Sequence, residues 1–198
     1  MGGISTRKNG QKRGVHEQPE TPALSIVCDT REQRPYDFAR FGAAVERGIL
    51  ATGDYSLTGH EHRAAIERKS LDDLVGCLTV GRARFERELD RARALALFAV
   101  VVEASMEDVA RGRYTSRMKP HAALQSILAF QVRYAVPFVW AGSRAGAEYV
   151  TYWTLQKYAR EVEAMKTGNE TPARQNAAQV EIRGNQRKLE EKKEEVTK

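Results

Sequence analysis

The chain has 198 residues, of which 41% are hydrophobic and 29% are charged, which is typical of a globular protein. No apolar run approaches the roughly 18 residues that a membrane span needs, and the basic N-terminus has no apolar stretch behind it, which argues against a secretory signal. The net charge of +6 permits a nucleic-acid partner. Residues 23–165 hold 20 basic and 18 acidic residues, so a binding face there needs local clustering.

Composition divides the chain into three segments. Residues 1–22 are polar with almost nothing to bury, and are predicted to be a disordered basic arm. Residues 166–198 form a linker and a highly charged tail, predicted to be disordered or a frayed helix. Residues 23–165 are long enough to bury a core, so one folded domain is expected there. Cys28 and Cys77 lie in apolar sequence and are interpreted as reduced thiols of a cytosolic protein.

Apolar and turn patterns predict the elements of this domain. The first half should hold a strand (24–29), a short helix closed by Gly48 (38–48), a strand bent at Gly53 (49–57) and, after a turn, the returning strand of a hairpin (63–69). The second half should begin with a helix capped by Ser70, a charged helix (81–95) and the most hydrophobic strand, expected at the centre of the sheet (96–104). A helix from Ser105, a helix with Pro120 in its first turn (120–134), a strand (136–142) and a final helix (143–165) should follow. This order predicts an α/β domain with a mixed sheet covered on both faces.

The predicted hairpin gathers charged side chains. Because side chains alternate along a strand, Glu67 and Lys69 should point to one face and Arg68 to the other. A turn near 59–62 would bring Asp54 close to Glu67. Two carboxylates beside a lysine suit phosphodiester cleavage, since Mg²⁺ (or Mn²⁺) is held by carboxylates and a lysine offsets transition-state charge. The alternative is a solvated strand end whose Glu–Lys pairs contribute little energy.

Other acidic residues lie at the ends of predicted elements. Asp29 and Glu32, in "DTRE", follow the first strand at the end where α/β sheets gather their ligands. Gly53 lets the backbone bend directly before Asp54. Asp73 lies one turn into the next helix, close to its positive end, whereas Asp72 is interpreted as an ordinary first-turn acid.

Together the segments "VCDTRE", "GDYSL" and "IERKSLDDL" resemble the nuclease domain of the XPF family of structure-specific endonucleases. That family carries GDx(n)ERKx(3)D after a D-x-R-E segment, and the matching positions here are Gly53, Asp54, Glu67, Arg68, Lys69 and Asp73, with Asp29, Arg31 and Glu32 upstream. The resemblance covers about residues 24–165. It implies a restriction-endonuclease-like α/β core and divalent-metal-dependent cutting of DNA at junctions of duplex and single strand, such as flaps.

The resemblance and the residue chemistry together give each candidate a role. Three carboxylates are predicted to hold the metal: Asp54, Glu67 and Asp29. Lys69 should assist the water or the transition state, and Glu32 and Asp73 should complete or support the site. Arg68, facing away from Glu67, should hold the local structure.

Two basic stretches are candidates for DNA contacts. In the charged helix, Arg82 follows a glycine and Arg84 begins a one-faced stripe, for which an exposed helix with arginine–glutamate pairs is an equal alternative. The stretch "RGRYTSRMK" surrounds an aromatic residue with basic ones, and Arg113, Arg117 and Lys119 suit a strand-binding loop. A plain solvated loop is the alternative there.

Departures from the family leave partners and activity open. Eukaryotic members follow this domain with tandem helix-hairpin-helix modules and pair with a second subunit, whereas no such hairpins are visible in this chain. DNA binding is therefore expected to be weak, or to need a homodimer or another protein, and no membrane partner is expected. The protein could also be a non-catalytic DNA-binding subunit, or a nuclease of plain duplex DNA. The expected location is cytoplasmic, and nucleoid-associated in a bacterium or phage.

Overall fold

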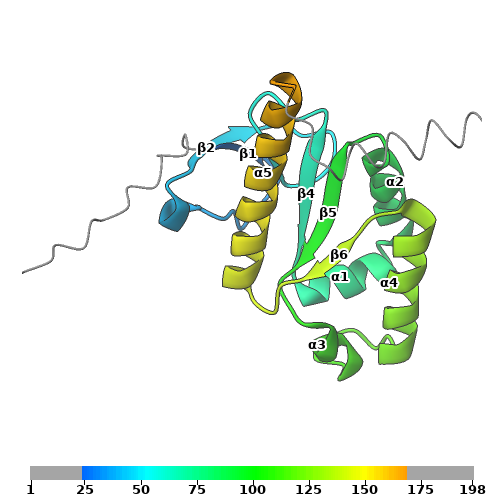
Figure 1. The fold of residues 1–198 in the computed structure, drawn as a ribbon. Coiled ribbons are helices and arrows are strands. Elements are labelled where there is room, and N and C mark those ends of the chain that lie inside the picture. The colour runs from blue at the N-terminus through cyan, green and yellow to red at the C-terminus, as the bar shows by residue number, and fades with distance from the viewer. Residues whose placement is uncertain (1–23, 169–198) are drawn as a thin grey trace, which may run out of the picture.

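In the computed structural model, residues 24–168 are described and form one sheet with helices on both faces (Figure 1). The strands are β1 (Ser25–Asp29), β2 (Ala44–Gly48), β3 (Tyr55–Leu57), β4 (Ala64–Lys69), β5 (Leu97–Val102) and β6 (Phe138–Trp140). The helices are η1 (Ala39–Phe41, 3-10), α1 (Leu71–Leu78), α2 (Arg82–Ala92), α3 (Met106–Ala110), α4 (Pro120–Tyr134) and α5 (Arg144–Lys166). The arm predicted at 1–22 and the tail from residue 169 onward lie outside the described residues.

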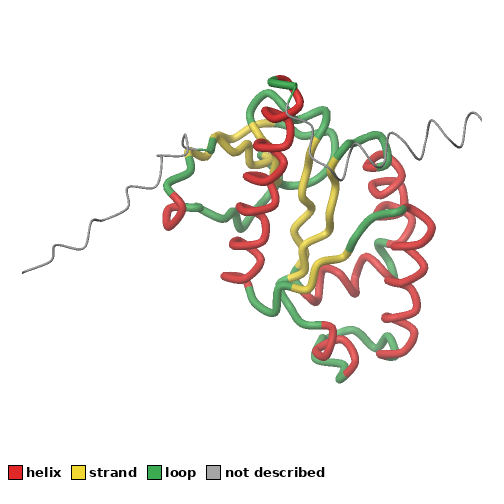
Figure 2. Tube along the Cα trace, in the orientation of Figure 1, coloured by secondary structure: helices red, strands yellow, loops and turns green. Residues whose placement is uncertain are grey.

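The sheet is mixed, as predicted, with the order β2-β1-β3-β4-β5-β6. β1 and β2 are parallel, β3 is antiparallel to both β1 and β4, and β4, β5 and β6 are parallel. β4 and β5 run side by side through the middle of the molecule (Figure 2). Because β1, β4 and β5 point the same way, their carboxyl ends meet at one edge of the sheet, where α/β proteins collect functional residues.

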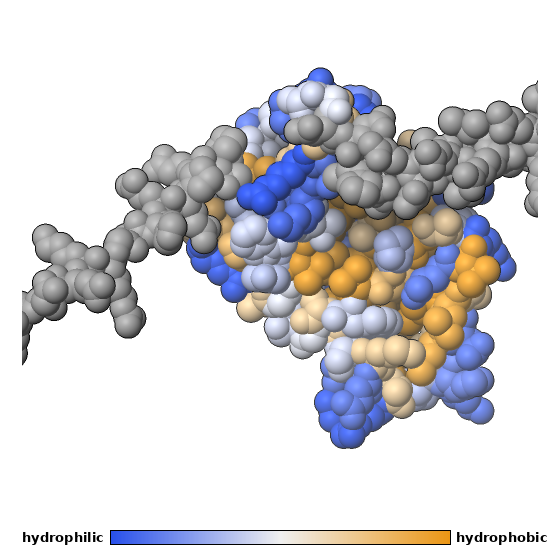
Figure 3. Space-filling view, in the orientation of Figure 1, coloured by the Kyte–Doolittle hydropathy of each residue, from blue (hydrophilic) through white to orange (hydrophobic). Residues whose placement is uncertain are grey.

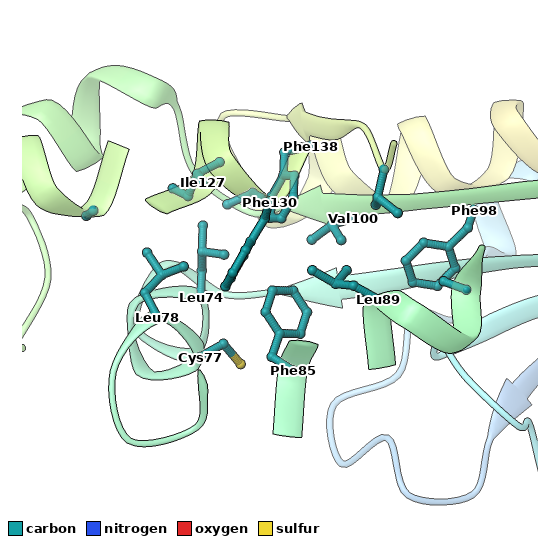
Figure 4. Packing of buried hydrophobic residues seen from close by; sticks show 14 of the residues in the cluster. Leu74, Cys77, Leu78, Phe85, Leu89, Phe98, Val100, Ile127, Phe130 and Phe138 are labelled. Carbon is teal, nitrogen blue, oxygen red and sulfur yellow. The ribbon is translucent and has the colours of Figure 1, made fainter. Parts of the chain in front are cut away.

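Two apolar clusters cover the two faces of the sheet. Along β5, Phe98, Val100 and Val102 face the cluster built with α1, α2 and α4, whereas Ala99 and Val101 face the cluster under α5. Figure 4 shows the first cluster, in which aromatic side chains of α2, α4 and β6 meet. Burial on both faces explains the continuous apolar run of β5. Hydrophobicity had predicted the centre of the sheet for this strand, but β5 lies next to the edge strand β6.

The helix predicted at 38–48 is wrong. Only Ala39–Phe41 form a 3-10 turn, which ends at Gly42 with a φ of 67°, and Ala44–Gly48 form the edge strand β2. Its side chains are mostly exposed, so no alternation of buried and exposed residues marks it as a strand. Gly48 is not a helix cap; it lies so close to β1 that a Cβ there would approach Val27 Cγ1 to 2.7 Å.

The helix starts are confirmed by their caps. Ser70 accepts a hydrogen bond from the backbone N–H of Asp73 at the start of α1, and Ser105 forms a capping box with Asp108 at the start of α3. Pro120 occupies the first turn of α4. None of the helices within residues 24–168 is long and apolar enough to cross a membrane. Apolar residues do reach the surface over α4 (Figure 3). Val132 of α4 is 86% exposed.

Candidate active site

A cavity of about 690 Å³ opens at the edge of the sheet where β1 and β4 end. Acidic and basic side chains dominate its lining. Most of the residues singled out in the sequence meet in this cavity: Glu32, Asp54, Glu67, Arg68, Lys69, Asp73 and Arg84. The geometry therefore joins four segments that lie up to 52 positions apart in the sequence.

Asp54 is fixed between β1 and β4 by its own backbone. Its N–H donates to the carbonyl of Ile66 (2.8 Å), and its carbonyl accepts from the N–H of Asp29 (2.8 Å). The carboxylate atom Oδ2 accepts from the backbone N–H of Arg68 (2.8 Å). Burial raises the pKa of Asp54 to about 6, although this hydrogen bond and the charge of Lys69 act in the opposite direction. Asp54 is thus a carboxylate that a cation would stabilise in its ionised form.

Gly53 makes this placement of Asp54 possible. Its φ is 81°, and a Cβ there would meet Ala65 Cβ at 2.8 Å and the carbonyl oxygen of Ile66 at 3.2 Å. A side chain at position 53 would therefore combine left-handed backbone strain with a clash against β4.

We expect Gly53→Ala to lower both stability and any activity that depends on Asp54. Gly59 is a matched control, since its φ is 80° and nothing lies within 4 Å of its Cβ position. Gly59→Ala should cost about 1–2 kcal/mol in the free energy of unfolding, measured by urea denaturation. Gly53→Ala should cost about 3 kcal/mol because overpacking adds to the strain. Equal losses in the two variants would contradict the predicted clash.

Glu67 is the most deeply buried carboxylate of the cavity, with 3% of its surface exposed. Burial raises its pKa well above the ordinary value of 4.5, against the effect of Lys69, which forms an ion pair with Glu67 Oε1. The pKa of Lys69 is lowered by burial and raised by Glu67, and the net direction is upward. Lys69 therefore stays protonated, and its Nζ also lies 5.2 Å from the ring centroid of Phe85 in α2.

Asp29 is separate from the other two predicted metal ligands. It is 1% exposed and is not among the residues that line the cavity. Its Oδ1 accepts from the backbone N–H and the Nε of Arg31, and its Oδ2 accepts from Arg31 Nη2 (2.9 Å) and the N–H of Leu50 (2.7 Å). Burial raises the pKa of Asp29, but these hydrogen bonds outweigh it and hold the pKa below 3.8. Asp29 thus organises the "DTRE" loop, and its assignment to the metal stays a prediction.

Three further acidic residues have different surroundings. Glu32 lines the cavity, accepting from the N–H of Arg34 (2.5 Å) and from Arg68 Nη1 (3.3 Å). Asp73 accepts from the hydroxyl of Ser70 (2.6 Å) in the first turn of α1. Asp72, interpreted from the sequence as an ordinary first-turn acid, accepts two hydrogen bonds from Thr115 and so attaches the loop between α3 and α4 beside the cavity.

Two further acidic residues lie near the site and were not predicted from the sequence. Glu88 of α2 lies within hydrogen-bond reach of Glu67 and raises the pKa of that carboxyl. Its position in the sequence could have indicated this, because it directly precedes Leu89 and follows Phe85 by three positions, and both of these residues are buried. Glu103 follows β5 directly and binds Arg68 on the other face of the sheet. Only its position at a strand end could have pointed to it.

The candidate DNA contacts fall into different environments. Arg84 lines the cavity, whereas Arg82 pairs with Glu86 (3.2 Å) and packs its guanidinium over the ring of Phe130 (4.6 Å). Arg113 pairs with Asp108 (2.7 Å). Within residues 24–168, neither Arg117 nor Lys119 forms an ion pair, and both are exposed in the loop that Thr115 attaches to α1.

Residues 28–152 match the ERCC4 domain. The chain belongs to the ERCC4 domain family. The match covers every candidate site residue from Asp29 to Lys119 and supports a DNA nuclease or DNA-binding role. The predicted resemblance to XPF-type nucleases is thereby confirmed.

Solved structures extend the comparison of this ERCC4 domain. XPF from Aeropyrum pernix is 20% identical, with a TM-score of 0.56 over 72% of this chain and 69% of that chain. The structure of XPF from Aeropyrum pernix in complex with DNA is 22% identical, with a TM-score of 0.56 over 69% of this chain and 66% of that chain. No curated protein sequence matches the chain. At these identities the structures show a shared fold, and the predicted restriction-endonuclease-like core is confirmed.

Proposed function

We propose that this ERCC4 domain is a divalent-metal-dependent DNA endonuclease that hydrolyses phosphodiesters at branched or flapped junctions of duplex and single strand. The observation that carries the proposal is the convergence of Asp54, Glu67 and Lys69 in one cavity at the carboxyl edge of the sheet. Two carboxylates and a protonated lysine are the groups that phosphodiester hydrolysis needs.

The residues present fit Mg²⁺ (or Mn²⁺). Burial raises the pKa values of Asp54 and Glu67, so a cation held by these two carboxylates would stabilise both ionised forms. No group of three or more His, Cys, Asp or Glu between residues 24 and 168 is arranged as a metal cage. Mg²⁺ does not require one, because it is usually held by one or two carboxylates and completed by water and phosphate oxygens. When bound, the ion would polarise the phosphoryl group and lower the pKa of a water molecule.

Lys69 supplies positive charge rather than a base in this proposal. Its net pKa shift is upward, so it holds its proton at neutral pH and can donate hydrogen bonds to phosphate oxygens. The cavity residue Arg84 and the loop residues Arg117 and Lys119 would bind the DNA backbone on either side of the reacting phosphate. Branched DNA arises in repair and recombination, and we propose that the protein acts there, on chromosomal or phage DNA in the cytoplasm.

A second candidate function is DNA binding without catalysis. Two observations favour it. Glu67 and Lys69 form an ion pair with each other in the absence of substrate, and the oxygens of Asp29 already accept hydrogen bonds from Arg31 and Leu50. A homodimer or a separate partner subunit stays a proposal in either case.

Cleavage of labelled DNA tests the proposal. We expect the purified protein to cut flap and splayed-arm DNA in Mg²⁺ or Mn²⁺ and not in EDTA, with slower cutting of blunt duplex. Glu67→Gln should abolish cutting, and Glu61→Gln, in the hairpin turn, should not. Binding without cutting by the wild-type protein would favour the non-catalytic function, and equal rates on all three substrates would exclude a branch preference.

A further inference from the structure

A buried ion-pair network extends from the cavity toward α5: Arg68 and Glu32 line the cavity, whereas Glu103 does not. The Arg68 side chain is 6% exposed, and its Nε and Nη2 donate to Oε1 (2.8 Å) and Oε2 (2.9 Å) of Glu103. This is a two-bond contact between a planar guanidinium and a carboxylate, the most directional ion pair that proteins form. Arg68 is therefore fixed chiefly by Glu103, since its contact with Glu32 is longer, at 3.3 Å.

Glu103 is itself fixed by two other segments. Its Oε1 accepts from the hydroxyl of Tyr36 (2.9 Å) and from Nη1 of Arg144 (2.9 Å) in the first turn of α5. Arg144 also donates to the carbonyls of Arg34 and Pro35, so it joins the "DTRE" loop region to α5. Burial raises the pKa of Glu103, but Arg68 and Tyr36 outweigh it, and the carboxylate stays ionised.

The network controls the end of β4, which carries the cavity groups. The backbone N–H of Glu103 donates to the carbonyl of Lys69 (2.9 Å), while the backbone N–H of Arg68 donates to Oδ2 of Asp54 (2.8 Å). Glu103 thus holds positions 68 and 69 by both side chain and backbone. Charge also balances, because two guanidinium groups face two carboxylates, Glu32 and Glu103. Without the charge of Glu103, Arg68 would draw Glu32 away from the cavity.

We propose that Glu103 is a positioning residue that sets the cavity groups through Arg68. It keeps the end of β4 in register with Asp54 and leaves Glu32 facing the cavity, without itself lining that cavity. The inference rests on the proposed function, since positioning is measured as catalysis. It assigns to α5, through Arg144, a part in the alignment of the site.

Glu103→Gln tests this role, because glutamine keeps the size of the side chain and removes its charge. We expect kcat on flap DNA to fall by about 10- to 100-fold, as for a small misplacement of reacting groups. The Kd for DNA, measured in Ca²⁺, should be unchanged, because no contact with DNA is removed. Glu148→Gln is the matched control: Glu148 is 15% exposed, pairs with Arg40 (3.1 Å) and accepts from the N–H of Phe38 (3.0 Å).

Both variants should unfold at lower urea concentrations, and only Glu103→Gln should lose kcat. If Glu103→Gln does not fold, Arg144→Gln removes one donor to Glu103 from a side chain that is 36% exposed, and kcat should again fall at constant Kd. A folded Glu103→Gln, or Arg144→Gln in its place, with the wild-type kcat would overturn the proposal.

A structural readout separates this proposal from the proposed function. In ¹⁵N NMR spectra of the full chain, the Nε–H of Arg68 should exchange slowly with solvent in the wild type and faster in Glu103→Gln, because a neutral amide oxygen is a weaker acceptor than a carboxylate. A wild-type protein that cuts no DNA would sink the proposed function. An exchange rate in Glu103→Gln equal to that of the wild type would sink the positioning role of Glu103, whether or not the wild type cuts.

Discussion

Asp54→Asn should abolish metal-dependent cleavage and at the same time stabilise the protein at pH 7. Cleavage should fall by about 10²- to 10³-fold or more, the scale on which a single electrostatic group contributes to kcat. Asparagine removes the charge that a cation needs but keeps an oxygen that can accept from the N–H of Arg68. Asp54 would then be a residue that the reaction requires although it lowers the stability of the folded protein.

The sign of the stability change follows from the pKa of Asp54. That pKa is about 6 in the folded protein and about 4 in an unfolded chain, so the folded state holds the proton more tightly. Stability therefore falls as pH rises from about 4 through about 6, and ionised Asp54 destabilises the protein at pH 7. Asp54→Asn removes this cost, and we expect a gain of about 1–2 kcal/mol in the free energy of unfolding at pH 7.

Urea denaturation in EDTA at pH 5 and pH 7 measures this effect. The difference between Asp54→Asn and the wild type should grow with pH. Asp90→Asn provides a control, because Asp90 is an exposed partner of Arg93 in α2 and its loss should change stability by less than about 0.5 kcal/mol. If Asp54→Asn is less stable than the wild type at pH 7, ionised Asp54 does not destabilise the folded protein and the prediction is wrong.

Phe85→Ala should give the largest loss of stability, about 3–5 kcal/mol in the free energy of unfolding. Phe85 is fully buried, and its ring lies 5.9 Å from that of Phe130 and 6.3 Å from that of Phe138, both in edge-on contact (Figure 4). Alanine would leave a cavity among rings that come from α2, α4 and β6. The change would also remove the ring beneath Lys69 and loosen the cation next to Glu67.

Phe85→Leu separates volume from the aromatic ring. Leucine fills most of the space, so it should cost less than the alanine variant, while the contact with Lys69 is lost in both. Urea denaturation gives the stabilities, and cleavage rates at a temperature where both variants are folded give the effect on Lys69. If Phe85→Leu cuts at the wild-type rate, the ring has no role at Lys69 beyond filling the core.

Local patterns in the sequence predicted much of the fold. The hairpin of β3 and β4, the Ser70 cap and the α/β class follow from turns, caps and periodicity within short windows. The strand β2 could not be predicted in this way, because its exposed side chains carry no pattern and it is a strand only through backbone pairing with β1. The position of β5 beside the edge is likewise set by β6, some 35 residues further along the chain.

The candidate site likewise has features that local sequence predicts and features that depend on distant segments. Alternation along β4 was enough to place Glu67 and Lys69 opposite Arg68, since the period of a strand is two residues. The partners of these residues come from distant segments: Glu103 and Arg144 for Arg68, and Glu88 for Glu67.

The order of residue types along the chain places carboxylates, a lysine and an arginine at the strand ends, and so sets the chemistry that the site can perform. Packing between distant segments sets the surroundings of each carboxylate, as Asp29 and Asp54 show. Both are aspartates at element ends, yet Arg31 and Leu50 saturate the first, while the second lines the cavity. The reason is physical: local spacing fixes the direction of a side chain, but its hydrogen-bond partners and its burial depend on packing between distant segments.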